Sequence, residues 1–102
     1  MGRGLSQLQQ AIIEALAEYP AFEDLPRGQA YGVEVIHIGD LPRLSDILDA
    51  LGRPRDNANR AAISQSLKRL CDRGLVTAIS GQVAGQGRGY RYAIMKGVQL
   101  VA

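Results

Sequence analysis

The side chains most able to make specific polar contacts lie in one stretch, RPRDNANRAAISQSLKRLCDRG, which runs from Arg53 to Gly74. Ile63, Leu67 and Leu70 recur there at the spacing of one helical face, which predicts a buried side. At 100° per residue the opposite face carries Ala61, Ser64, Gln65, Lys68 and Asp72, with Arg60 and Arg69 on its flanks. Small, polar and cationic side chains suit the major groove of DNA, whereas the alternative is an ordinary solvated helix face.

The charge of the chain is segregated along the sequence. Residues 1–50 hold three arginines against eight acidic residues, a net charge of −5, and residues 51–102 hold nine Lys or Arg against two acidic residues, a net charge of +7. Such a segregation of charge is expected of a protein that binds a polyanion through a basic surface. With 102 residues and 46% hydrophobic composition, we expect a single domain over 1–102 and no separate catalytic domain.

The sequence lacks the residues that several functional classes require. Cys71 and His37 are the single cysteine and the single histidine, so the sequence offers neither an internal disulfide nor a Cys/His metal cluster. The spacing of the other polar residues does not indicate any known combination of catalytic side chains. The glycines at 81–89 precede a strand, whereas a phosphate-binding loop must precede a helix. We therefore expect no enzyme, no metal and no cofactor. Because no apolar run could span a bilayer, we expect a cytoplasmic protein without a membrane partner.

The elements that must position the polar stretch are predicted from periodicity and caps. A capping box at Ser6 and Gln9 starts helix 1, and Asp40 is the expected N-cap of helix 2. The β-branched run after Gly32 predicts a short strand, which needs a partner further along the chain. The predicted bounds are about 6–18 for helix 1, 20–32 for a loop, 33–38 for the strand, about 41–51 for helix 2, about 57–73 for the third helix and 75–95 for a C-terminal β-hairpin.

The hairpin is predicted from two strand-like segments, LVTAIS and YRYAIM, joined by a glycine-rich connection. Alternation places Tyr90, Tyr92 and Ile94 on the face that packs on the helices. Arg91 then falls on the other face, so the arginines of the hairpin are expected to stay outside.

In this order of elements the sequence resembles the winged helix-turn-helix family of DNA-binding domains, over about residues 5 to 95. The segments LSDILDALG and AISQSLKRLCDRGLV are similar to the second helix, recognition helix and first wing strand of regulators of the multiple-antibiotic-resistance (MarR) type. The resemblance implies an α+β, mainly α fold, with three helices, a short strand and a C-terminal wing. It departs from the family between Gly52 and Ile63, where this chain is about five residues longer.

Roles follow from the helical wheel and from charge. Ser64, Gln65 and Lys68 are the candidates for base edges in the major groove, with Gln suited to adenine and Lys to guanine. Contacts to phosphate or the minor groove are expected from Arg55, Arg60, Arg69, Arg88 and Arg91. The longer connection before Ile63 leaves open which of Arg55, Asn57, Asn59 and Arg60 reaches bases and which reaches phosphate.

The predicted function is sequence-specific binding of double-stranded DNA by a transcriptional regulator. The alternative is a winged-helix module that docks on protein within a larger nucleic-acid-processing assembly, since one fold serves both uses. A homodimer is expected because two-fold operators need paired recognition helices, with helix 1 and the apolar tail Val98 to Val101 as its surfaces. The sequence shows no sensor domain, so an effector stays open.

Overall fold

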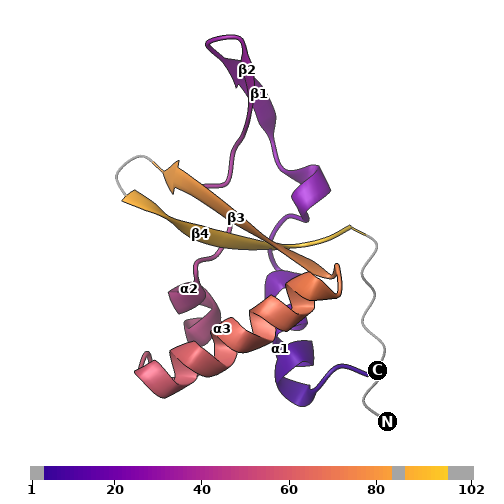
Figure 1. The fold of residues 1–102 in the computed structure, drawn as a ribbon, viewed down its shortest axis with the longest axis vertical. Coiled ribbons are helices and arrows are strands. Elements are labelled where there is room, and N and C mark those ends of the chain that lie inside the picture. Colours follow the sequence, from indigo (N-terminus) through magenta and orange to yellow (C-terminus); the bar gives the residue numbers. More distant parts are fainter. Residues whose placement is uncertain (1–3, 84–86, 97–102) are drawn as a thin grey trace.

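Helices lie at one end of the molecule and a projecting β-hairpin at the other, with a second hairpin between them (Figure 1). The computed structural model describes residues 4–83 and 87–96. In chain order the elements are α1 (Gln7–Leu16), the 3-10 helix η1 (Phe22–Asp24), β1 (Arg27–Ala30), β2 (Val33–Ile36), α2 (Leu44–Ala50), α3 (Asn57–Asp72), β3 (Val76–Val83) and β4 (Gly87–Ile94). Over these described residues, three α-helices and two antiparallel strand pairs form a small α+β fold, in agreement with the predicted class. None of the described helices is both long and apolar enough to cross a membrane.

The first helix, α1, begins at the predicted capping box. The backbone N–H of Gln9 donates to the Ser6 hydroxyl, and the backbone N–H of Ser6 donates to Gln9 Oε1, each at 3.1 Å. Two donors at the helix start are thereby satisfied. Ile12, Ile13 and Leu16 are completely buried. The protein's own core therefore takes up these three side chains of α1, and the homodimer with helix 1 as one of its surfaces stays a prediction.

The second helix, α2, begins later than predicted because the residues before it bind a strand. Asp40 is not its N-cap; that residue is Arg43, whose backbone N–H donates to the Asp46 carboxylate at 2.9 Å. Pro42 is buried ahead of the helix, and its carbonyl accepts a 3.1 Å hydrogen bond from the N–H of Tyr92 in β4. The segment before α2 is therefore extended, and the helix has seven residues.

Both α2 and α3 end at a glycine. Gly52 and Gly74 have φ angles of +68° and +76°, a region that strains any residue with a side chain. After Gly74 the N–H of Leu75 donates to the carbonyl of Leu70 at 3.1 Å, which is the hydrogen bond of a Schellman motif. This turn leads α3 directly into β3, so the helix and the strand are placed rigidly beside each other.

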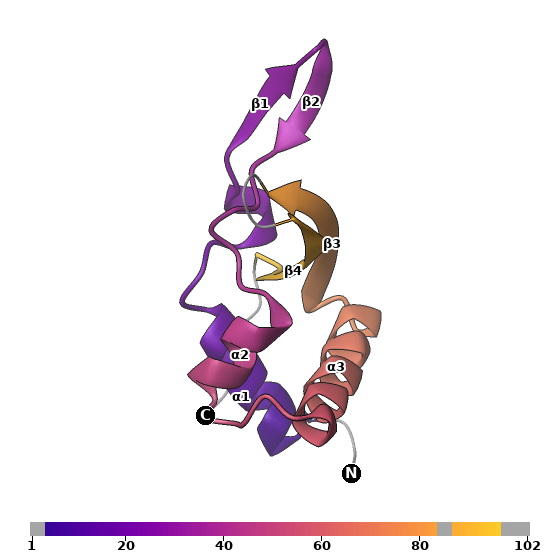
Figure 2. The ribbon, with the colours of Figure 1, turned by 90° about the vertical axis from the view of Figure 1, so that its left-hand side faces the viewer.

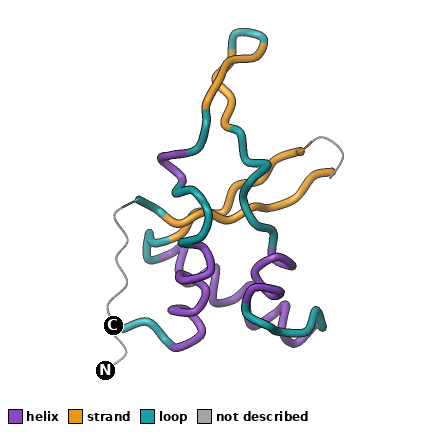
Figure 3. The backbone as a smooth tube through the Cα atoms, turned by 180° about the vertical axis from the view of Figure 1, so that it is seen from behind, coloured by secondary structure: helices purple, strands orange, loops and turns teal. Residues whose placement is uncertain are grey.

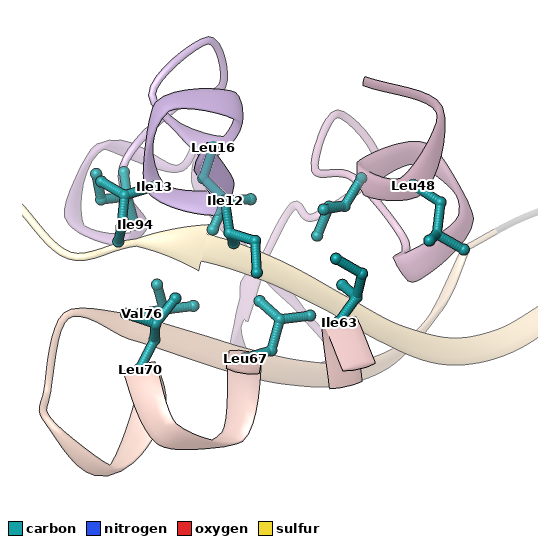
Figure 4. Close-up of a cluster of buried hydrophobic side chains, with 10 residues drawn as sticks. Ile12, Ile13, Leu16, Leu48, Ile63, Leu67, Leu70, Val76 and Ile94 are labelled. Carbon is teal, nitrogen blue, oxygen red and sulfur yellow. The ribbon is translucent and has the colours of Figure 1, made fainter. Parts of the chain in front are cut away.

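The main core lies between the three α-helices and one face of the β3–β4 hairpin (Figure 4). Its buried members are Ile12, Ile13, Leu16, Ile47, Leu48, Ile63, Leu67, Leu70, Val76 and Ile94. Ile63, Leu67 and Leu70 come from the apolar stripe of α3, which is confirmed as the buried side of that helix. Burying one such side chain stabilises the fold by about 1.5 to 3 kcal/mol, so this stripe fixes which side of α3 remains exposed.

The part of the β3–β4 hairpin nearest the helices is covered on both faces (Figure 2). Its strands are antiparallel, with Val76 opposite Ile94 near the helices. The face away from the helices carries Ala93, which packs in a second cluster with Leu25, Ile38 and Leu41. The hairpin is thus a middle layer. The chain between α1 and α2 covers the face of β4 that the alternation of the sequence had assigned to solvent.

The segment predicted as a loop over 20–32 contains η1 and β1 instead. β1 pairs with β2 in antiparallel register, from Arg27 opposite Ile36 to Ala30 opposite Val33, so the partner of the predicted strand precedes it. A two-residue turn joins them, with φ of 53° at Tyr31 and 77° at Gly32, as in type I′ hairpins. We call residues 27–36 the arm (Figure 3). The sequence did not predict the arm because Tyr-Gly is not one of the usual signals for this turn.

Candidate nucleic-acid interface

The exposed side of α3 is the side predicted from the helical wheel. Ser64, Gln65 and Lys68 are exposed, whereas Ile63 and Leu67 beneath them are buried, at 0% and 1% of their full exposure. Because the helix is anchored through its apolar stripe, the three polar side chains are presented on a rigid support. They can therefore donate and accept hydrogen bonds without a cost to the core.

The N-terminal end of α3 is tied by a small hydrogen-bond network. Asp56 Oδ1 accepts from the backbone N–H of Asn59 at 2.8 Å and from its side-chain Nδ2 at 2.9 Å, which caps the helix. Asn59 Oδ1 in turn accepts from Arg53 Nη1 at 3.1 Å. Asn59 is therefore a structural residue in this conformation, and of the two asparagines predicted as contacts it is Asn57 that is exposed.

Arg55 is paired with an acidic residue of α2. Its Nε donates to Asp49 Oδ1 at 3.1 Å, and its Nη2 donates to Asp49 Oδ2. The hydrogen bond from Arg55 lowers the pKa of Asp49, and the same bond raises the pKa of Arg55. Both side chains are about half exposed, and exposed ion pairs contribute little to stability. Arg55 can therefore exchange its carboxylate partner for a phosphate at small cost.

The remaining cations of α3 do not form one continuous patch. Arg60 is half-buried, and Arg69 is exposed. Arg69 lines a shallow hollow beside the start of α1, together with Ser6 and Gln9. The structure thus separates Arg69 from Lys68, because Lys68 lines a different hollow.

Lys68 lines a groove of about 380 Å³ between α3 and the β3–β4 hairpin. Its lining residues are Ser64, Leu67, Lys68, Cys71, Ala78, Tyr90 and Tyr92. Leu67 is buried and Cys71 half-buried, whereas Ser64 and Lys68 are exposed. The groove therefore combines an apolar interior with polar, cationic edges contributed by two of the predicted base-reading residues.

Tyr90 is a candidate contact that the sequence prediction missed. Alternation placed Tyr90 with Tyr92 against the helices, and both tyrosines do line the groove. However, Tyr90 is 60% exposed, whereas Tyr92 is half-buried and packs against the main core. Alternation along a strand predicts the face on which a residue lies but not where along that face the helices end. It therefore could not distinguish the exposed Tyr90 from the half-buried Tyr92.

Burial governs the titrating groups inside the groove. It raises the pKa of the Cys71 thiol, with a further contribution from the charge of Asp72, and it also raises the pKa of Tyr92. Both groups are consequently neutral near pH 7, and a protonated thiol is a poor nucleophile. Across residues 4–83 and 87–96, no three His, Cys, Asp or Glu side chains are placed to hold a metal ion.

Arg91 is not the exposed phosphate contact that alternation predicted. It is 6% exposed, and its Nη1 donates to the carbonyl oxygens of Leu41 at 2.7 Å and Gly39 at 3.3 Å. The physical reason is that the segment before α2 covers this face of β4, so the guanidinium is enclosed. Its charge is used to satisfy backbone carbonyls, and Arg91 is removed from the candidate interface.

Three predicted features lie outside what the structure describes. The backbone of Arg88 pairs with Gln82 in the hairpin, but its side chain is not among the described ones. The tip of the predicted wing, 84–86, and the apolar tail, 97–102, are likewise outside the described residues. Arg88 therefore stays a predicted contact.

Within the described residues, the polar face of α3, the groove beside it and Tyr90 form one contiguous candidate surface, which we call the α3 surface. Its side chains are hydrogen-bond donors and acceptors with one cationic group, Lys68, at the groove. Such a set can bind a polar, anionic partner but offers no activated nucleophile. Comparisons of the chain with protein-family models, with curated proteins and with solved structures find no match.

Proposed function

We propose that this protein binds double-stranded DNA as a winged helix-turn-helix domain and acts as a transcriptional regulator. In this proposal α3 is the recognition helix, α2 is the helix before it and the β3–β4 hairpin is the wing. The observation that carries the proposal is the exposed polar face of α3, in which Ser64, Gln65 and Lys68 stand opposite a fully buried apolar stripe. A helix of this kind can enter the major groove without disturbing the core.

The groove beside α3 supports the same proposal. When a helix lies in the major groove and a hairpin lies beside it, one sugar-phosphate strand passes between them. The Tyr90 hydroxyl can then bind phosphate, Lys68 at the edge of the groove can reach a base, and the apolar lining can pack against deoxyribose. The basic second half of the sequence adds long-range attraction to a polyanion.

The experiment selects preferred duplexes from a randomised library and titrates them with wild-type protein and with the double variant Gln65→Ala, Lys68→Ala. Losing a base contact costs about 1 to 3 kcal/mol, so each substitution should weaken binding roughly 5- to 150-fold on the preferred site and reduce discrimination there. Each phosphate contact should add about −0.9 to the slope of log affinity against log salt.

A matched control removes the same two residue types elsewhere. The double variant Gln29→Ala, Lys96→Ala also loses one amide and one positive charge, and both positions are exposed and lie outside α3, where Lys96 Nζ pairs with Asp24 at 3.1 Å. It should bind DNA within about twofold of wild type, apart from the small uniform effect of the charge. Equal affinity for the two double variants would refute the assignment of α3. Absence of duplex binding by the wild type at low salt would refute the function itself and favour a protein-docking module.

A further inference from the structure

The connection between α2 and α3 places Arg55 beside the start of the α3 surface. This connection crosses the end of the molecule that lies opposite the arm (Figure 2). Arg55 is exposed there, and the exposed Asn57 follows it as the first residue of α3. Asn57 and Ser64 are about two helical turns apart, so they lie on the same side of α3. Because the N-terminal residues of a recognition helix contact base edges, Arg55 lies next to the part of the surface at which bases are read.

Arg55 is held by one edge of its guanidinium group. Its Nε donates to Asp49 Oδ1 at 3.1 Å and its Nη2 donates to Asp49 Oδ2, so the contact is bidentate. An arginine has five N–H donors in a fixed fork, and this edge uses two of them. The terminal edge, formed by Nη1 and the second hydrogen of Nη2, has no hydrogen-bond partner among the residues that the structure describes. The side chain of Arg55 is 55% exposed, so a partner from outside can reach this edge.

The charges around Arg55 make phosphate a poor partner for it. The hydrogen bond and the charge of Asp49, and then the charge of Asp46, raise the pKa of the guanidinium. The pair of Arg55 and Asp49 is electrically neutral and is therefore attracted only weakly to a polyanion. Opening the pair costs little in itself, but it would leave the Asp49 carboxylate unpaired and facing the phosphates. The uncharged acceptors of a base do not repel this carboxylate.

The terminal edge of an arginine matches one base in the major groove. Guanine presents O6 and N7 there, two acceptors side by side, whereas each of the other three bases presents at most one acceptor. Two parallel N–H groups can bind both atoms of guanine at once. The contact with Asp49 restricts the rotamers of the long side chain before DNA arrives, so less conformational entropy is lost when the base is bound.

We propose that Asp49 is a positioning residue that orients Arg55 to read one guanine in the major groove. This inference rests on the proposed binding of duplex DNA and adds a base pair to those expected for Gln65 and Lys68. It assigns Arg55 to a base, where the sequence left open a base or a phosphate. Asp49 itself touches no DNA in this arrangement, because both of its carboxylate oxygens accept from Arg55.

The first part of the experiment identifies the guanine. The selection from a randomised duplex library is repeated with Arg55→Ala, and one G·C pair of the wild-type site should lose its preference. Discrimination is then the ratio of the dissociation constants for the duplex with A·T at that position and for the preferred duplex. We expect a ratio of roughly 5 to 150 for wild type and about 1 for Arg55→Ala. Arg55→Lys should also bring the ratio close to 1, because lysine keeps the charge but has no fork of donors.

The second part tests the positioning role. Asp49→Ala should lower the ratio about threefold or more when Arg55 is present, and should change nothing further when it is combined with Arg55→Ala. The matched control is Asp40→Ala, which removes the same charge from an exposed aspartate outside α2. It should leave the ratio unchanged, because a uniform electrostatic effect acts on both duplexes and cancels. Circular dichroism checks that every variant stays folded.

A measurement without DNA tests the pair itself. Followed by NMR, the pKa of the Asp49 carboxyl should lie below its ordinary range in wild type, because of the hydrogen bond from Arg55. It should return to that range in Arg55→Ala. An ordinary pKa in the wild-type protein would show that the pair does not form in solution, and would overturn the proposal.

The binding outcomes separate this proposal from the function on which it rests. If wild type binds duplex DNA but Asp49→Ala keeps the full ratio, the positioning role is overturned and the carboxylate only repels phosphate. If no G·C pair depends on Arg55, its assignment to a base is overturned while duplex binding stands. Absence of duplex binding by the wild type would overturn both. A ratio lowered by Asp49→Ala, and only in the presence of Arg55, supports the proposal.

Discussion

Replacing Arg91 by methionine should unfold the protein at a lower temperature rather than weaken a DNA contact. Methionine keeps most of the apolar length of the arginine but removes its donors. The carbonyl of Leu41, which accepts at 2.7 Å in a buried position, then loses its partner, and so does the carbonyl of Gly39 at 3.3 Å. The expected consequence is that the segment before α2 separates from β4 more easily.

The magnitude follows from the two hydrogen bonds. A hydrogen bond to a charged group contributes about 1.5 to 3 kcal/mol, and the longer one contributes at the lower end. Removing a buried charge recovers part of this, because the guanidinium no longer has to be desolvated. The net loss is about 2 to 4 kcal/mol. For a domain of this size, 1 kcal/mol shifts the melting temperature by roughly 4 to 8 °C, so Arg91→Met should melt roughly 10 to 30 °C below wild type.

The assay pairs thermal unfolding, followed by circular dichroism, with duplex titration at a temperature where all variants are folded. Lys68→Met is the control, since it makes the same change at an exposed position on α3. It should keep its stability within about 0.5 kcal/mol and lose DNA affinity, whereas Arg91→Met should do the reverse. A melting temperature of Arg91→Met within about 3 °C of wild type, together with weaker DNA binding, would refute the assignment of Arg91 as a buried structural residue.

Two further predictions concern the groove and the arm. Burial raises the pKa of the Cys71 thiol in the folded state. The protonated thiol therefore stabilises the fold fully at pH values below the ordinary thiol pKa, and this contribution is lost as the pH rises through the raised pKa. Urea denaturation between pH 7 and pH 10 should therefore show wild type losing free energy of unfolding relative to Cys71→Ala; parallel pH profiles would contradict this. Tyr31→Asn should stabilise the fold by about 0.5 to 1 kcal/mol, because asparagine tolerates the positive φ that Tyr31 adopts, and should raise the melting temperature. An unchanged or lower melting temperature would show that the tyrosine is not strained there.

Local patterns in the sequence were sufficient to predict the three α-helices, although not where α2 begins. The Ser6–Gln9 capping box, the Asp56 cap and the glycines after α2 and α3 act over a few residues, so their chemistry is complete within the segment. The apolar stripe of α3 predicted its buried side, because a regular helix has one period and one face must be buried. The division between Ile63 or Leu67 and the exposed polar residues could therefore be predicted, and with it the polar face of α3, which is one part of the α3 surface.

Tertiary packing decided the features that depend on which segment covers which face. Alternation along β4 correctly distinguished its two faces but assigned Arg91 to solvent, because nothing local shows that the chain before α2 returns over that face and supplies carbonyl acceptors. The arm was missed for a related reason. β1 is short and contains a glycine and two polar residues, so its strand character comes from pairing with β2 rather than from its own sequence. The groove between α3 and Tyr90 likewise exists only once the helix and the hairpin are side by side, since its two walls are separated in the chain and meet through the packing of the core.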